Sequence, residues 1–252
     1  MRRTSLKTRA TFPRMRSSDV IQALAPLASP ENTARFSRFF KTGPGEYAHG
    51  DVFLGVPVPA QRQIALRFRD MAQEEVTRLL HSPIHEHRMT ALLLWTAQAR
   101  KGSMEQRAAI AHTYRANLRW INNWDLVDVS ASPLLGQYLR DKHLSVPESL
   151  VVSPVLWERR VAIVATHAWV RQGDAGEALR LAEALLGDPE DLLHKALGWT
   201  LREVGKHVSP AHLREFLHQH AARMPATALR AAIERFPETE RRAWRQKRIP
   251  RP

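Results

Sequence analysis

DPEDLLHKALGWTLREVGK, residues 188–206, shows most clearly how this chain is built. Asp188 and Pro189 form a helix start signal, because aspartate can cap a first turn and proline is favoured at the first helical position. Gly187 lies just before them, where a connection between helices is expected. Apolar residues then recur at the spacing of a helix. We therefore predict a helix over 188–206 with Asp188 as its cap.

Helical patterning of this kind runs from residue 18 to the end of the chain, and no segment alternates like a strand. Ser29-Pro30-Glu31 is a second start signal, and its helix is expected to place Phe36, Phe39 and Phe40 on a core face. Further helices are expected over 60–70, 72–81, 85–101, 103–118, 123–141, 153–172, 174–186, 209–221 and 225–236. The sequence therefore predicts an all-α protein.

The expected helices pair at a spacing of roughly 35–45 residues, which is the period of HEAT-like repeats. The pairs are 85–118, 123–150, 153–186 and 188–221. Because one pair cannot bury its own apolar face, neighbouring pairs must stack into a curved solenoid. We predict a HEAT-like helical repeat solenoid with a concave surface that can bind a DNA duplex. An irregular helical bundle remains the alternative.

The net charge of +13 is concentrated at the two ends of the chain. Residues 1–16 and 241–252 each carry six basic residues and no acid, whereas 17–240 carries 26 basic and 25 acidic residues. We predict a basic flexible arm over 1–17, a single solenoid domain over 18–236 and a basic flexible tail over 237–252. The arms could bind phosphates by counterion release, or they could be solubilising ends.

Composition also limits the chemistry. The chain has no cysteine, which excludes disulfides, thiolate metal sites and cysteine nucleophiles. No apolar run approaches the roughly 20 residues needed to span a bilayer, and 20–28 is short for a signal segment. His85-x-His87 and His218-x-His220 lack companion ligands, so no metal and no cofactor is expected. We predict a cytoplasmic protein that does not bind membranes.

The candidate site begins with Asn123-Trp124-Asp125-Leu126-Val127-Asp128. On a helix, Trp124 and Asp128 lie one turn apart, where a ring and a carboxylate can hold a cation or a cationic sugar transition state. Such a pair can equally be a packed ring beside a solvated acid. Arg160 lies 36 positions after Trp124, and Trp199 lies 39 after Arg160. Residues one repeat apart can converge on one concave surface.

Five strings in this order resemble the AlkD-like DNA alkylation repair glycosylases, from about Phe39 to about Lys206. They are FFKTGPGEY (39–47), GDVFLGV (50–56), NWDLVD (123–128), WERR (157–160) and KALGWTLRE (195–203).

The resemblance implies excision of cationic N3- or N7-alkylated purines from double-stranded DNA. It places the catalytic carboxylate on Asp128 and the active-site tryptophans on Trp124 and Trp199. The DNA-contacting arginine falls on Arg160, with Arg159 as the alternative.

Structural interpretations of the same residues stay open. Trp124 and Trp199 could be core rings, and Arg160 could be an ion-pair partner between repeats, with Glu158 or Asp125. Asp125 is expected to be a cap or structural acid. The glycine-rich loop over 43–50 is not a P-loop, because its lysine precedes the glycines. Tyr47 in that loop could belong to a lid or simply pack.

Two functional hypotheses follow. The first is a monomeric, monofunctional alkylpurine DNA glycosylase without strand-cleaving activity, because no obvious lysine joins Trp124, Asp128, Arg160 and Trp199 to form a Schiff base. The second is a non-catalytic HEAT-repeat scaffold that binds DNA or a protein, which the near-neutral body would also suit.

Overall fold

The computed structural model describes residues 15–247, and across that range it consists of helices with one isolated bridge, between Val52 and Ile84, and no β-strand. The α-helices are α1 (Ser17–Leu24), α2 (Pro30–Phe39), α3 (Val58–Arg67), α4 (Gln73–Leu80), α5 (His85–Lys101), α6 (Met104–Ala116), α7 (Trp124–Ser130), α8 (Gln137–Asp141), α9 (Glu148–Val151), α10 (Leu156–Ala165), α11 (His167–Val170), α12 (Gly176–Ala184), α13 (Asp191–His207), α14 (Pro210–His220), α15 (Ala226–Ala232) and α16 (Glu238–Lys247). Short 3₁₀ turns cover Ala25–Leu27 and Leu118–Trp120. The predicted all-α helical repeat fold is confirmed.

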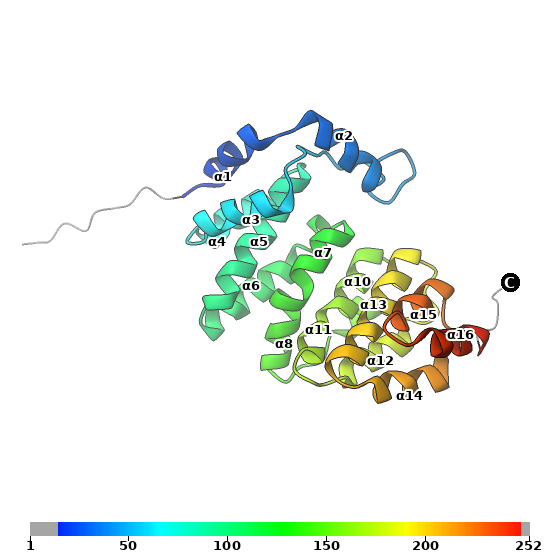
Figure 1. Ribbon diagram of the computed structural model, residues 1–252. Helices are drawn as coiled ribbons and strands as arrows, with labels where there is room; N and C mark the ends of the chain where they lie inside the picture. The colour runs from blue at the N-terminus through cyan, green and yellow to red at the C-terminus, as the bar shows by residue number, and fades with distance from the viewer. Residues whose placement is uncertain (1–14, 248–252) are drawn as a thin grey trace, which may run out of the picture.

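One row of helices runs through the molecule, in which α5 packs on α7, α7 on α10, α10 on α13 and α13 on α15 (Figure 1). The helices α3 and α4 pack on α5, while α12 and α14 pack on α13. Gly198 permits close packing of α13 on α15, because a Cβ there would lie 2.5 Å from the Ala228 carbonyl oxygen of α15. Residues one repeat apart therefore lie on neighbouring helices, as their spacing predicted.

The helix predicted over 188–206 begins later than expected. α13 starts at Asp191 with Glu190 at the N-cap, so Asp188 is not the cap. Asp188 instead accepts a hydrogen bond from Arg159 Nε at 2.6 Å and from the Glu190 N–H at 2.9 Å. Asp188 thus links Arg159 of the preceding repeat to Glu190, the residue just before α13, and bonds to no N–H group within the helix.

A wide turn follows the WDLVD motif. The helix predicted over 123–141 is α7, a π-helical segment over Ala131–Gly136, and α8. Pro133 lies inside that segment and cannot donate a backbone hydrogen bond. The wider π turn accommodates a residue that cannot donate a backbone hydrogen bond. Such turns are common beside functional sites. The π segment therefore rotates the side chains of α8 relative to those of α7, compared with a continuous α-helix.

The N-terminal motif GDVFLGV is held by one buried side chain. Glu86 is 1% exposed and accepts the backbone N–H groups of Leu54 at 2.9 Å, Gly55 at 2.8 Å and Val56 at 3.3 Å. Gly55 has a φ of 80°, and a Cβ there would lie 2.3 Å from the Ser29 carbonyl oxygen. The motif therefore fixes the segment that returns from α2 to α3.

One apolar cluster extends from Val20 in α1 to Trp244 in α16. Trp244 is 5% exposed, so residues 238–247 form a packed helix and the prediction of a flexible tail over 237–252 was wrong for them. The arm residues 1–14 and the tail residues 248–252 lie outside the described part of the chain. The buried indole explains the packing, because a tryptophan supplies a large apolar area.

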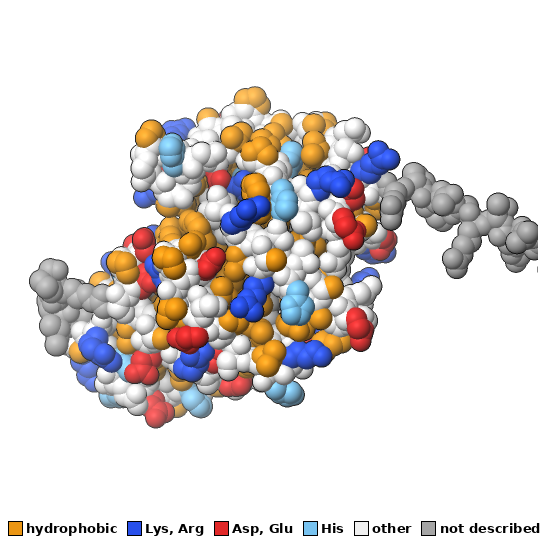
Figure 2. Space-filling view, turned by 180° about the vertical axis from the view of Figure 1, so that it is seen from behind, with side chains coloured by type: hydrophobic (Ala, Val, Ile, Leu, Met, Phe, Trp, Pro, Cys, Tyr) orange, Lys and Arg blue, Asp and Glu red, His pale blue; other side chains and the backbone are white. Residues whose placement is uncertain are grey.

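The surface of the described body carries both signs of charge. Lysine and arginine side chains alternate with aspartate and glutamate over the face in Figure 2, in agreement with the near balance over 17–240. Among the helices of residues 15–247, none is long and apolar enough to cross a bilayer.

Candidate active site

A cleft of about 620 Å³ opens between the loop after α2 and the row of helices α7, α10 and α13. The N-terminal ends of these helices face α2 and the loop that follows it in Figure 1. The cleft is lined by Phe39, Lys41, Tyr47, Trp124, Asp128, Arg160, Glu190, Asp191, Leu192, Lys195 and Trp199. Four predicted site residues, from three repeats, therefore lie on one surface.

Asp128 and Arg160 form a bidentate ion pair within this cleft. Arg160 Nε donates to Asp128 Oδ1 at 3.0 Å and Arg160 Nη2 donates to Oδ2 at 2.9 Å. Arg160 Nη1 donates to the carbonyl oxygen of Leu192. The Asp128 side chain is 20% exposed and that of Arg160 is 6%. The carboxylate is thus held in one orientation and still borders the open space.

Burial raises the pKa of Asp128 above its ordinary value, while the positive charge and hydrogen bonds of Arg160 oppose that rise. The negative charge of Asp125, one turn away, raises the pKa further. Removing Arg160 would therefore favour the protonated acid.

Arg160 is not placed as the motif suggested. We expected it to contact a DNA phosphate, but its guanidinium is buried on Asp128 and Leu192. It is an ion-pair partner between repeats, as the alternative interpretation held, although neither Glu158 nor Asp125 is the partner. Arg159 lies outside the cleft lining and pairs with Asp188.

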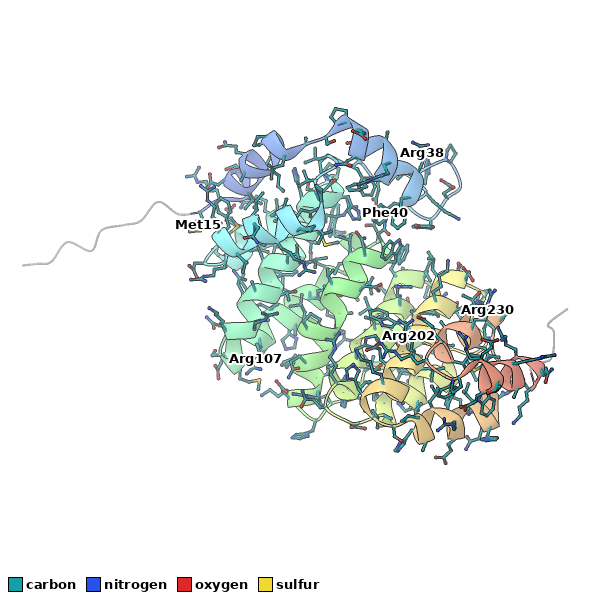
Figure 3. All side chains as sticks on the ribbon, in the orientation of Figure 1. Met15, Arg38, Phe40, Arg107, Arg202 and Arg230 are labelled. Atoms are coloured by element: carbon teal, nitrogen blue, oxygen red, sulfur yellow. The ribbon has the colours of Figure 1, made fainter. Side chains whose placement is uncertain are left out.

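Trp124 forms the wall of the cleft nearer the N-terminus. Its Nε1 donates to the Tyr47 hydroxyl at 3.2 Å, and its ring stacks on Phe40 with centroids 5.3 Å apart. Phe40 lies between α2 and the start of α7 (Figure 3). Phe39 is 63% exposed and lines the cleft, so its prediction as a core residue was wrong. It contacts the edge of Trp124, with centroids 5.9 Å apart.

Trp199 forms the opposite wall. It is half-buried, and the ring of His167 meets it edge to face with centroids 4.4 Å apart. His167 Nε2 lies 2.9 Å from Thr200 Oγ1. Burial is the main cause that lowers the pKa of His167 to about 3, so this ring is neutral at pH 7. The second tryptophan therefore rests on an uncharged support.

The cleft residues that the sequence missed or left undecided include a tyrosine and two lysines. Tyr47 lines the cleft, and its ring packs at the edge of Trp157 with centroids 6.1 Å apart. Lys41 and Lys195 are exposed cleft residues, and Lys195 Nζ pairs with Asp191 Oδ2 at 2.9 Å. Lys195 precedes Trp199 by one helical turn, a spacing that could have indicated it. Two lysines therefore line the cleft beside the four predicted residues.

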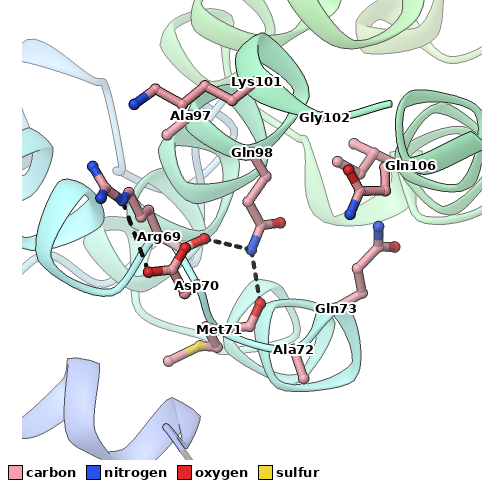
Figure 4. Close-up of a pocket in the computed structure, with 11 residues that line it drawn as sticks. Arg69, Asp70, Met71, Ala72, Gln73, Ala97, Gln98, Lys101, Gly102 and Gln106 are labelled. Carbon is pink, nitrogen blue, oxygen red and sulfur yellow. Dashed lines mark hydrogen bonds and ion pairs between the residues drawn. The ribbon is translucent and has the colours of Figure 1, made fainter. Parts of the chain in front are cut away.

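A second hollow lies between the α3–α4 connection and α5 (Figure 4). Gln98 Nε2 donates there to the carbonyl oxygens of Arg69 at 3.0 Å and Met71 at 2.7 Å. Its one carboxylate, Asp70, is 78% exposed and 3.8 Å from Arg69. This hollow lacks an indole beside a held acid. No group of three His, Asp or Glu side chains is arranged so that it could hold a metal ion among residues 15–247.

The fold and the cleft define a helical-repeat protein with a held carboxylate between two indoles. The family model described as DNA alkylation repair enzyme matches residues 20–236. A solved structure described as a predicted DNA alkylation repair enzyme from Enterococcus faecalis has a similar fold. Its TM-score is 0.64 at 18% identity, and the match covers 84% of this chain and 97% of that one. No match was found among curated proteins. The chain belongs to the DNA alkylation repair enzyme family.

Proposed function

We propose that this protein is a monofunctional DNA glycosylase that hydrolyses the N-glycosidic bond of N3- or N7-alkylated purines in double-stranded DNA. The observation that carries the proposal is the Asp128 carboxylate, fixed by Arg160 in a cleft that Trp124 and Trp199 line. Family membership supports a DNA substrate. We propose that the protein acts as a monomer in the cytoplasm, associated with the nucleoid.

The chemistry follows from the charge of the damaged base. Alkylation at N3 or N7 makes the purine cationic and hence a good leaving group, so strong protonation by an acid is unnecessary. Positive charge moves to the deoxyribose as the bond breaks, and a nearby carboxylate stabilises it and can orient or deprotonate water. Each indole face adds about 0.5–2 kcal/mol to the binding of a cation. An uncharged base gains neither advantage.

Arg160 supports this reaction through Asp128. Because it takes both carboxylate oxygens from one side, the acid cannot turn away from the cleft. The exposed cations that line the cleft, Lys41 and Lys195, would then contact the DNA phosphates. Such contacts set the register of the duplex without selecting its sequence.

The released products test the proposal. DNA treated with a methylating agent is incubated with the protein, and the bases that come off are identified by chromatography. We expect 7-methylguanine and 3-methyladenine but no normal base. Binding to DNA without any base release would support the non-catalytic scaffold instead.

A second assay tests the monofunctional class. Lys195 is 57% exposed and paired with Asp191, whereas a lysine that forms a Schiff base is typically desolvated and free of such a partner. Borohydride should therefore trap no covalent complex with the abasic product. A trapped complex that disappears in Lys195→Ala would show a lyase.

A further inference from the structure

A buried ionic bridge lies behind the Trp124 wall, and nothing in the proposed chemistry uses it. His85 is the first residue of α5, and its side chain is 3% exposed. Its Nε2 lies 2.9 Å from Asp125 Oδ2, and its Nδ1 lies 3.3 Å from Asp51 Oδ2. One imidazole thus separates two carboxylates from different segments.

The geometry favours a charged ring. A neutral imidazole has one N–H donor, so one of its nitrogens would turn a lone pair toward a carboxylate. Only the imidazolium donates to both acids. The charged groups that face His85 are Asp51 before α3, Asp125 on α7 and Arg88 on its own helix. Burial and Arg88 lower the pKa of His85, but the two acids outweigh them and raise it to about 9.

The bridge joins the three segments that build the Trp124 wall. Asp51 ends the glycine-rich loop that carries Tyr47, and it also accepts from Arg88 Nη2 at 2.7 Å and Asn123 Nδ2 at 3.2 Å. Asp125 belongs to the first turn of α7, between Trp124 and Asp128. The loop and α7 are therefore tied to the same end of α5.

Aromatic packing extends this connection to the cleft. The His85 ring stacks on Phe53 with centroids 4.5 Å apart and lies 5.3 Å from Phe40. Phe40 in turn stacks on Trp124. A displaced imidazole would disturb both the acid beside Trp124 and the ring beneath it.

We propose that His85 is a positioning residue for the cleft. Its imidazolium, bonded to Asp51 and Asp125, holds the first turn of α7 against the Tyr47 loop and so sets the places of Trp124 and Asp128. The positive charge also offsets that of Asp125, which would otherwise favour protonation of Asp128. The inference rests on the proposed glycosylase function for its kinetic consequence only.

The test compares the full-length parent, His85→Gln and Asp125→Asn, with His212→Gln as the control because His212 is an exposed residue of α14. Ring ¹⁵N shifts, measured without DNA, should show His85 protonated at pH 7, with a lower pKa in Asp125→Asn. Hydrogen exchange should show faster opening of residues 41–50 and of α7 in His85→Gln. A neutral ring at pH 7 overturns the proposal.

Single-turnover release of 7-methylguanine from a duplex supplies the kinetic test between pH 7 and 9.5. We expect about a tenfold slower step at pH 7 in His85→Gln with nearly unchanged DNA affinity, as small misplacements cost such factors. The parent should lose rate near pH 9, and His85→Gln should be flat there. Parental rate and parental exchange in a folded His85→Gln contradict the proposal.

Asp125→Asn, which keeps the side-chain size, serves the same comparison if His85→Gln fails to fold. A parent that releases no base defeats the glycosylase proposal alone, because the titration and the exchange still decide the role of His85.

Discussion

The two walls of the cleft each present one indole, but they hold it by different means. Trp124 is backed by a network of full charges, in which Asp51 and Asp125 enclose His85. Trp199 rests on His167, a neutral ring beside the Thr200 hydroxyl. The Trp124 wall includes a loop whose position depends on contacts with other segments. The Trp199 wall is one continuous helix, α13. A loop needs bonds to distant residues for its position to be fixed, whereas a helix is held by its own local hydrogen bonds.

Arg160 connects the two walls, and its loss should have the largest effect. Arg160→Gln leaves the Asp128 carboxylate half-buried and unpaired, so we expect a loss of about 3 kcal/mol in the free energy of unfolding. The pKa of Asp128 should rise, and base release should fall at a higher pH than in the parent as the solution is acidified.

Arg159→Gln is the matched control, since Arg159 pairs with Asp188 outside the cleft. Denaturant unfolding and a pH–rate profile measure both variants. If Arg160→Gln weakened DNA binding and left the acid limb in place, Arg160 would be a phosphate contact after all.

Substitution of each tryptophan compares the walls directly. Trp124→Phe removes the donor to Tyr47 and should slow single-turnover release about tenfold, whereas Trp199→Phe should slow it about threefold, within the range of cation–π energies. Trp120→Phe, at an indole that stacks on His81 away from the cleft, should have no kinetic effect. A larger loss in Trp199→Phe would reverse the ranking of the walls.

The two histidines should give opposite pH dependences of stability. His85 has a raised pKa of about 9, so its contribution is complete below the unfolded value near 6.5 and is lost as pH rises through 9. His167 has a lowered pKa of about 3, so its contribution is lost as pH falls from 6.5 toward 3.

Thermal melts of the parent, His85→Gln and His167→Gln across this range measure both effects, which should change Tm by about 3 °C or more. His85→Gln should flatten only the alkaline side, and His167→Gln only the acid side. If Tm changed with pH in the same way in all three proteins, neither histidine would have the shifted pKa described here.

The lysines at the mouth should have the smallest effect. Lys41→Ala and Lys195→Ala should each reduce the slope of log affinity against log salt by about 0.9, as the loss of one phosphate contact does. Lys206→Ala, an exposed residue at the far end of α13, is the control. An unchanged slope in both variants would place the phosphates elsewhere.

The sequence predicted the helices and the convergence of Trp124, Asp128, Arg160 and Trp199, because repeat spacing determines which residues meet on neighbouring helices. The sequence could not predict which ion pair each charged side chain forms. Arg160 pairs with Asp128 because both side chains are largely withdrawn from solvent on adjacent helices, and this pairing depends on side-chain rotamers.

Contacts with the loop over 40–51 were also beyond the sequence. Tyr47, Lys41 and Phe39 reach the cleft only because Asp51 and Glu86 fold this segment back, through bonds to residues more than 30 positions away. The periodicity of a short stretch of sequence does not indicate hydrogen bonds to residues so far away in the chain. Trp244 was missed for a simpler reason, since a high density of positive charge near the C-terminus concealed a single buried indole.

The most direct measurement is single-turnover release of 7-methylguanine from a duplex with one lesion, by the parent, Asp128→Asn and the exposed control Asp70→Asn. Circular dichroism and duplex binding first establish that each variant is folded. We expect Asp128→Asn to release the base at least about 100-fold more slowly while it still binds DNA, because it lacks the charge that stabilises the sugar cation. Equal rates in Asp128→Asn and the parent would remove the carboxylate from the reaction.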